Sequence, residues 1–210
     1  MTTFTKVIEV APQAKDAHYG LALAYMSLGR DAQAEPHFRQ AIELDPKWSN
    51  PKNALASLLI RSRRCPEAET LLRKTLDDIF YLTPEFARHN LARALVCQGK
   101  SPEAIKELDT LLARRPQFCL GYLTLAQISS DEKMPDRTIK SCEAFTTQCE
   151  AHQEIAKQIS ADHSCYCLHK KGVAYAELGD VESAQAALSG CRGDAPNCRE
   201  CFAALQLLSR

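Results

Sequence analysis

The chain has 210 residues, and its 26 lysines and arginines balance 26 aspartates and glutamates, so the formal net charge is zero. A neutral chain lacks the broad positive surface that nucleic-acid binding requires, and no stretch is apolar for long enough to cross a bilayer. We therefore expect no nucleic-acid partner and no membrane-spanning segment. The basic clusters at 61–64 and 114–115 fall where turns between helices are expected, and we interpret them as solvated turns.

Ten cysteines are many for a chain of this size. Cytosolic proteins are held reduced and rarely accumulate cysteines except as metal ligands, whereas exported proteins use them in pairs as crosslinks. The cysteine content therefore favours export. The first residues, Met1 to Lys6, contain no apolar signal core, so we expect any targeting segment to have been removed from this chain.

The first predicted element is a helix over 3–11, which Pro12 ends. Phe4 lies 34 residues before Phe38, and Pro12 lies 34 residues before Pro46. This spacing indicates that 3–11 is the second helix of a pair whose first helix is missing.

Helix pairs are predicted along the rest of the chain. A small residue, a large residue three positions later, a turn glycine and a terminal proline recur in the same order. Small residues let two helices approach closely, glycine turns the chain, and proline ends the second helix. The clearest copies are Ala22, Tyr25, Gly29 and Pro46; Ala92, Leu95, Gly99 and Pro116; and Gly172, Tyr175, Gly179 and Pro196. The predicted helices are 15–28, 31–44, 49–62, 66–80, 84–98, 102–114, 117–130, 135–158, 163–178, 181–191 and 197–208.

This pattern resembles the tetratricopeptide (TPR) repeat, whose period is about 34 residues. The resemblance implies an all-α TPR superhelical solenoid forming a single domain over 1–210, with a half repeat, about five helix pairs and a C-terminal capping helix. Such solenoids hold other polypeptides in a concave groove. We therefore expect protein binding, no enzyme activity and no cofactor.

Two repeats depart from the regular length. The second repeat is two residues longer than its neighbours, and its extra residues lie in 77–84, which we interpret as a longer second helix followed by an aromatic turn. A larger surplus falls around 149–164. For this part we expect a lengthened helix and a loop.

One segment carries a more specific resemblance. Residues 81–85, Tyr-Leu-Thr-Pro-Glu, followed by His-Asn-Leu-Ala at 89–92, are similar to a segment of the TPR lipoproteins of type IV pilus biogenesis. These are the PilF/PilW pilotins and the social-motility protein Tgl, and the cysteine content fits Tgl better. The match is strongest over 49–128.

That resemblance implies a monomeric lipoprotein on the periplasmic side of the outer membrane. Its partner would be an outer-membrane secretin subunit, whose assembly it promotes for type IV pilus biogenesis. A lipid anchor would be its membrane contact, and we expect the signal peptide and the lipidated cysteine to be missing from this chain.

Two alternatives come from other classes of protein. In the first, the chain is a cytosolic TPR scaffold or co-chaperone that binds a peptide segment, and its cysteines are reduced or metal-bound. In the second, it is the regulatory repeat region of a larger enzyme.

In a TPR protein the concave wall is lined by the first helix of each repeat. Read onto this chain, the wall combines apolar and amide side chains, which suit an amphipathic helix or an extended segment. For Leu23 and Val96, packing between helices is the competing interpretation. The predicted partner-binding residues are Tyr19, Leu23, Met26, Asn53, Ser57, Ile60, Phe86, His89, Asn90, Arg93 and Val96.

Co-chaperones that grip an acidic chaperone tail use a clamp of lysine, asparagine and arginine. The corresponding positions here carry Tyr19, Leu23, Ala54, Phe86 and Asn90. That function is therefore disfavoured.

Two cysteine motifs have competing chemical interpretations. His163, Cys165, Cys167 and His169 are the right residue types for zinc, but positions two apart on a helix face different ways, so the four would not form one site. Cys198 and Cys201 have the spacing of a redox pair, but redox folds need strands that this chain lacks. We therefore expect structural crosslinks and no metal.

Repeat geometry suggests which cysteines meet. The turn cysteine of repeat two, Cys65, and Cys97 of repeat three approach the same edge of adjacent repeats. The other eight cysteines follow residue 118. The expected partners are Cys142 or Cys149 with Cys165 or Cys167, and Cys191 with Cys198 or Cys201.

Overall fold

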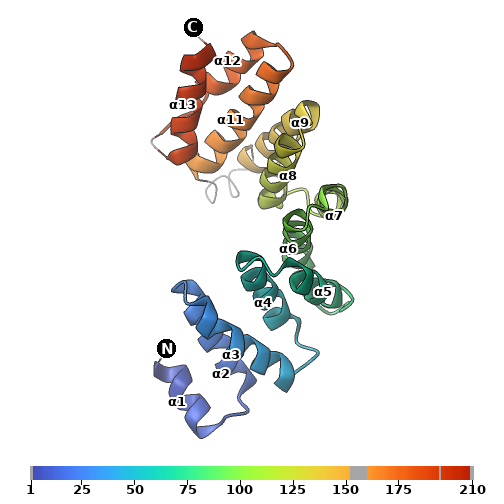
Figure 1. Ribbon diagram of the computed structural model, residues 1–210, viewed down its shortest axis with the longest axis vertical. Helices are drawn as coiled ribbons and strands as arrows, with labels where there is room; N and C mark the ends of the chain where they lie inside the picture. Colours follow the sequence, from blue (N-terminus) through green and yellow to red (C-terminus); the bar gives the residue numbers. More distant parts are fainter. Residues whose placement is uncertain (1, 152–159, 194, 209–210) are drawn as a thin grey trace. The chain divides into compact units, whose positions relative to one another are not determined.

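The computed structural model describes residues 2–151, 160–193 and 195–208, and within them every regular element is a helix (Figure 1). The predicted all-α class is confirmed. Contacts divide the chain into two compact units, Met1–Ala104 and Ile105–Arg210. The single continuous domain stays a prediction. No described helix is both long enough and apolar enough to cross a bilayer.

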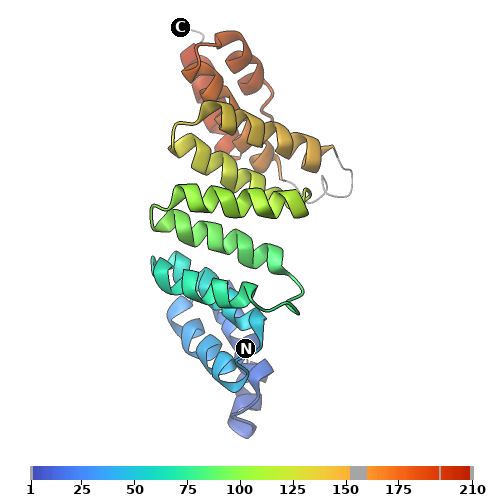
Figure 2. The same cartoon turned by 90° about the vertical axis from the view of Figure 1, so that its right-hand side faces the viewer.

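The N-terminal unit consists of a lone helix followed by helix pairs. Helix α2 packs against α3, and α4 packs against α5, as successive antiparallel helices (Figure 2). Helix α1 packs on α2 and occupies the place of the predicted half repeat. The bounds are α1 Thr2–Val10, α2 Lys15–Ser27, α3 Asp31–Leu44, α4 Ser49–Arg61, α5 Cys65–Leu76 and α6 Pro84–Cys97, and α7 Ser101–Arg114 contains the boundary between the units.

Fully buried small and large residues alternate at the contacts between paired helices. Ala22 on α2 has no exposed surface, and neither do Ala34 and Phe38 on α3. The next pair repeats this arrangement with Ala56 on α4 and Leu72 on α5, both also fully buried. The alanines permit close approach of the helices and the large side chains fill the space beside them, as the sequence predicted.

The turn inside each helix pair has the same backbone geometry. One residue adopts the left-handed conformation, and the next backbone N–H bonds back to the carbonyl five residues earlier, as from Arg30 to Tyr25 at 2.9 Å. Glycine is expected there because it has no Cβ. Two pairs nonetheless use a residue with a side chain, Arg63 at φ 60° and Lys133 at φ 55°.

The helix expected over 66–80 is shorter and ends at Leu76. The cause is Asp78, whose Oδ1 accepts the Phe80 backbone N–H at 3.0 Å and whose Oδ2 accepts the Ser49 hydroxyl at 2.6 Å. An aspartate that binds the backbone two residues on stabilises a turn in place of a helix. The extra residues of this repeat therefore form a loop.

The C-terminal unit contains two further helix pairs and a capping helix. Helix α13 packs on α11 and α12, as predicted for the cap. The helix expected over 135–158 ends at Phe145 and continues as a π-helical turn, and the remainder of that prediction includes 152–159, outside the described residues. The bounds are α8 Cys119–Asp131, α9 Pro135–Phe145, η1 Thr146–Glu150, α11 Ala161–Glu177, α12 Val181–Ser189 and α13 Pro196–Leu208.

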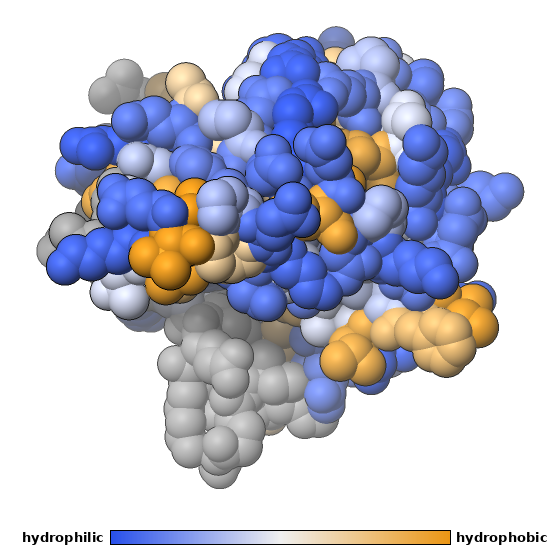
Figure 3. Space-filling view, turned by 90° about the horizontal axis from the view of Figure 1, so that it is seen from below, coloured by the Kyte–Doolittle hydropathy of each residue, from blue (hydrophilic) through white to orange (hydrophobic). Residues whose placement is uncertain are grey.

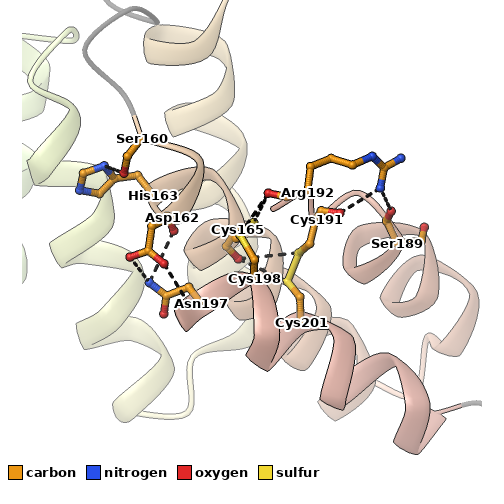
Figure 4. Close-up of a disulfide and its surroundings, with 10 residues drawn as sticks. All are labelled: Ser160, Asp162, His163, Cys165, Ser189, Cys191, Arg192, Asn197, Cys198 and Cys201. Atoms are coloured by element: carbon orange, nitrogen blue, oxygen red, sulfur yellow. Dashed lines mark hydrogen bonds between the residues drawn. A yellow bond between two sulfur atoms is a disulfide. The ribbon is translucent and has the colours of Figure 1, made fainter. Parts of the chain in front are cut away.

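Four disulfides crosslink the described residues. Cys65 is bonded to Cys97, the pair that repeat geometry suggested, and Cys191 is bonded to Cys201, one of the two expected options. The other two differ from expectation. Cys149 is bonded to Cys119, and Cys165 is bonded to Cys198, as Figure 4 shows. The bonded pairs are Cys65–Cys97, Cys119–Cys149, Cys165–Cys198 and Cys191–Cys201.

Helix geometry explains the two corrections. Cys119 begins α8 and Cys149 follows the end of α9, so the antiparallel pair brings them to the same edge. On α11, Cys165 and Cys167 are two positions apart and face different neighbours. Cys165 is bonded to α13, whereas Cys167 meets Cys142 of α9, and both of those cysteines are buried free thiols. The hydrogen bond with Cys142, and then burial, raise the pKa of the Cys167 thiol.

The left-handed turns yield a first prediction. Replacing Arg63 or Lys133 by glycine should raise the free energy of unfolding by about 0.5 to 1 kcal/mol, because the left-handed conformation is strained for a residue with a Cβ. The matched change Gly29→Ala, at φ 70°, should lower it by about 1 kcal/mol. Chemical denaturation of the three variants measures both effects, and opposite signs would contradict the turn geometry.

The disulfides yield a second prediction. After unfolding without reductant, two of the ten cysteines should react with an alkylating reagent, and mass spectrometry should locate the label at Cys142 and Cys167. In the folded protein both should react slowly because their side chains are buried. Reaction of all ten thiols without reductant would show that the crosslinks do not form.

Candidate protein-binding face

The first helices of the N-terminal unit bring predicted binding residues onto neighbouring elements. Helix α2 contacts α4, and α4 contacts α6. Tyr19 lies on α2, Asn53 on α4, and Asn90 and Arg93 on α6. Residues three or four positions apart share one face of a helix, so Phe86, Asn90 and Arg93 follow the same side of α6.

An aromatic cluster lies at the α2 end of this face. The Tyr19 ring packs against Trp48 with a centroid distance of 4.8 Å and against Phe38 at 6.0 Å. Burial, and then the nearby Tyr81, raise the pKa of the Tyr19 phenol, so it stays protonated and can donate a hydrogen bond at neutral pH.

A line of polar side chains continues across α4 and α6. Arg93 donates to Asn90 Oδ1 at 3.1 Å, and Asn90 donates to Asn53 Oδ1 at 3.0 Å. Asn53 in turn hydrogen-bonds the phenol of Tyr81, which also bonds Thr83. We call Tyr81, Asn53, Asn90 and Arg93 the polar strip.

No acidic side chain among the described residues pairs with Arg93, the positive end of the polar strip. Burial, and then the charge of Arg61, lower the pKa of the Arg93 guanidinium. Arg61 is itself paired with Asp31 at 2.6 Å. Within the described residues the one hydrogen bond of Arg93 is to the neutral Asn90, so this end of the strip attracts a carboxylate.

His89 lies beside Arg93 on α6 and is 9% exposed. Burial, and then the positive charge of Arg93, lower its pKa to about 4. The imidazole is therefore neutral at physiological pH, and it adds no charge to the face.

The remaining predicted residues differ in accessibility. Phe86 is 46% exposed and Ile60 only 9%, so Phe86 presents an accessible anchor and Ile60 belongs mainly to the core. Leu23, Met26, Ser57 and Val96 are half-buried. The prediction did not include Tyr81 or Trp48. The sequence features that could have indicated these two residues are the aromatic turn of the long repeat, for Tyr81, and the presence of a single tryptophan in the chain, for Trp48.

A smaller polar cluster lies on the first helices of the C-terminal unit. Gln127 of α8 accepts a hydrogen bond from the Tyr166 hydroxyl of α11 and donates to Asp131 at 2.6 Å. These partners satisfy its amide, so this cluster is structural.

Tetratricopeptide repeat models match residues 16–47, 53–117 and 166–197. Among curated proteins, anaphase-promoting complex subunit 3 of Schizosaccharomyces pombe is 27% identical over 141 residues, which are 66% of this chain and 21% of that protein. The chain thus spans about a fifth of the length of that relative.

Solved structures share the fold at low identity. A structure of PilW, described as a widely conserved type IV pilus biogenesis factor, has a TM-score of 0.81 at 21% identity, covering all of this chain and 89% of that one. Pseudomonas aeruginosa pilF has a TM-score of 0.71 at 18% identity, covering 89% and 78%. YrrB, described as a TPR protein with an unusual peptide-binding site, has 0.66 at 19%, covering 97% of each chain.

The buried His89 predicts a pH dependence of stability. Its pKa is about 4 in the folded protein and about 6.5 when unfolded, so the unfolded state gains the proton first. Stability should be constant above about pH 6.5 and fall between pH 6.5 and 4, by about 3 kcal/mol at most. His89→Gln should flatten that slope while leaving stability at pH 8 nearly unchanged. Denaturation at several pH values measures the free energy of unfolding. Equal pH slopes for the wild type and His89→Gln would contradict the lowered pKa of His89.

Proposed function

This chain belongs to the tetratricopeptide repeat family, and on that premise we propose that it binds a polypeptide segment on the face formed by α2, α4 and α6. The partner we propose is an outer-membrane secretin subunit, which this protein would help to assemble for type IV pilus biogenesis. Proteins of this repeat class are typically interaction scaffolds and not enzymes.

The polar strip is the observation that carries the proposal. Amide and guanidinium groups aligned across neighbouring helices can pair with the peptide groups of a bound segment, since Asn53 and Arg93 still have donors beyond the bonds described. Arg93 favours a carboxylate on the ligand, and Phe86, two turns nearer the start of α6 on the same side, offers an apolar contact. A segment that combines peptide, acidic and apolar groups fits this face.

Two observations support the pilotin assignment. The likeness of fold to PilW and pilF makes pilus biogenesis the leading context. Four disulfides favour an oxidising compartment such as the periplasm, because the cytosol keeps thiols reduced. We further propose that a lipid anchor in the full-length protein holds it at the outer membrane.

A binding measurement tests the proposal. Phe86→Glu should weaken binding of the purified secretin subunit from the same genome about tenfold or more. The reason is that the partner would cover a carboxylate in the complex where the wild type offers an apolar anchor. Phe86 is 46% exposed, so the variant should keep its melting temperature.

The matched control is Phe202→Glu on α13, where the phenylalanine is 40% exposed and lies in the other unit. It should bind the secretin subunit like the wild type. Equal affinity of both variants and the wild type would exclude the α6 face, and absence of binding by the wild type would exclude the secretin.

A further inference from the structure

The loop between α5 and α6 presents three large apolar side chains to solvent. Ile79 is 86% exposed, Phe80 84% and Leu82 89%. Single exposed apolar residues are common on protein surfaces, but three within four positions form a patch. Figure 3 shows one face of the molecule, on which hydrophobic side chains gather in separate patches amid hydrophilic surface. We call residues 77–83 the apolar loop.

Hydrogen bonds hold the apolar loop in one shape. Asp78 accepts the Ser49 hydroxyl at 2.6 Å and the Phe80 N–H at 3.0 Å, and the Tyr81 N–H donates to the Asp78 carbonyl at 3.1 Å. The Ser49 bond, followed by the Phe80 N–H, lowers the pKa of the Asp78 carboxyl. Tyr81 is half-buried and bonds Asn53. Because Asp78 and Tyr81 are used to anchor the loop, Ile79, Phe80 and Leu82 are displayed outward.

The display has an energetic consequence. Burying a large apolar side chain stabilises a folded protein, and the folded chain gains almost none of this stabilisation at these three positions. A pre-ordered loop also loses little conformational entropy when a partner binds. Ile79, Phe80 and Leu82 are therefore available for contact with a partner.

The charges around the apolar loop indicate the kind of partner. Residues 77–85 contain Asp77, Asp78 and Glu85 and no lysine or arginine. Lys52 of α4 offsets the charge of Asp78, and one carboxylate oxygen of Glu85 is buried, so within the described residues Asp77 is the acidic group of the loop that stays unbalanced. This charge repels an anionic bilayer and attracts basic groups. Through Tyr81, the loop is also continuous with the polar strip, where the proposed polypeptide binds.

We propose that the apolar loop is a second docking surface for that polypeptide. It takes a segment with at least two large apolar side chains flanked by lysine or arginine, next to the segment held by the polar strip. That this segment belongs to the polypeptide held by the polar strip rests on the proposed function. Its apolar and basic composition is inferred from the loop alone.

The probe for the test is a displayed library of random peptides selected on the full wild-type chain. Selected sequences should combine apolar and basic residues. Their affinity, measured by fluorescence anisotropy with synthetic peptides, should fall about tenfold or more in the variant Ile79→Ser, Phe80→Ser, Leu82→Ser. The control Leu28→Ser, at a residue that is 59% exposed at the end of α2, should leave affinity unchanged. Both variants should fold, since they change exposed side chains.

Four outcomes would overturn the docking surface. The first is a selection that yields no sequence. The second is equal affinity of the selected peptides for the triple variant and the wild type. Vesicles of phosphatidylcholine and phosphatidylglycerol bind the wild type but not the triple variant, which would assign the loop to lipid. Sedimentation detects a dimer that the triple variant loses, which would assign it to a second copy of this chain.

The secretin measurement separates this inference from the proposed function. If the secretin subunit fails to bind while selected peptides lose affinity in the triple variant, the proposed function is wrong and the docking surface stands. If the secretin subunit and the peptides bind the wild type and the triple variant equally, the docking surface is wrong and the proposed function stands.

Discussion

The structure depends on the close approach of paired helices at small residues. Ala22, Ala56 and Ala92 each have no exposed surface where a first helix meets its partner. In the last pair the position is Gly172, where a Cβ would lie 2.6 Å from Cγ of the fully buried Leu188. This contact fixes the distance between helices and so determines which side chains reach the face formed by α2, α4 and α6.

The two proposed binding features are the apolar loop and the polar strip. The apolar loop lies where the second repeat is irregular, and the polar strip lies where α4 and α6 carry polar side chains. Two extra residues in the second repeat cannot enter a regular helix pair, so they form the apolar loop, and Asp78 gives that loop its shape. The same loop brings Tyr81 to Asn53, which extends the polar strip beyond the helices. Regular repeats supply the scaffold, and we propose that the insertion supplies specificity.

Crosslinks are added to the repeat packing toward the C-terminus. Three of the four disulfides lie in the C-terminal unit, and Cys165, Cys191, Cys198 and Cys201 form one buried cluster with Leu188. Each closed loop contributes about 2 to 4 kcal/mol. Cys142 is different, since it occupies the repeat position of Phe38 and Leu72 and fills the core as a free thiol.

The sequence by itself determined the TPR fold, which is confirmed, and the helix pairs, because both follow from local periodicity that each repeat carries alone. It also indicated Cys65 with Cys97, since regular repeats place equivalent edges together. Only the tertiary structure decided the partners of Cys149 and Cys165, the left-handed turn at Arg63 and the outward display of Phe80. These depend on which way a side chain points after an insertion, and that direction is set by contacts with distant residues such as Ser49.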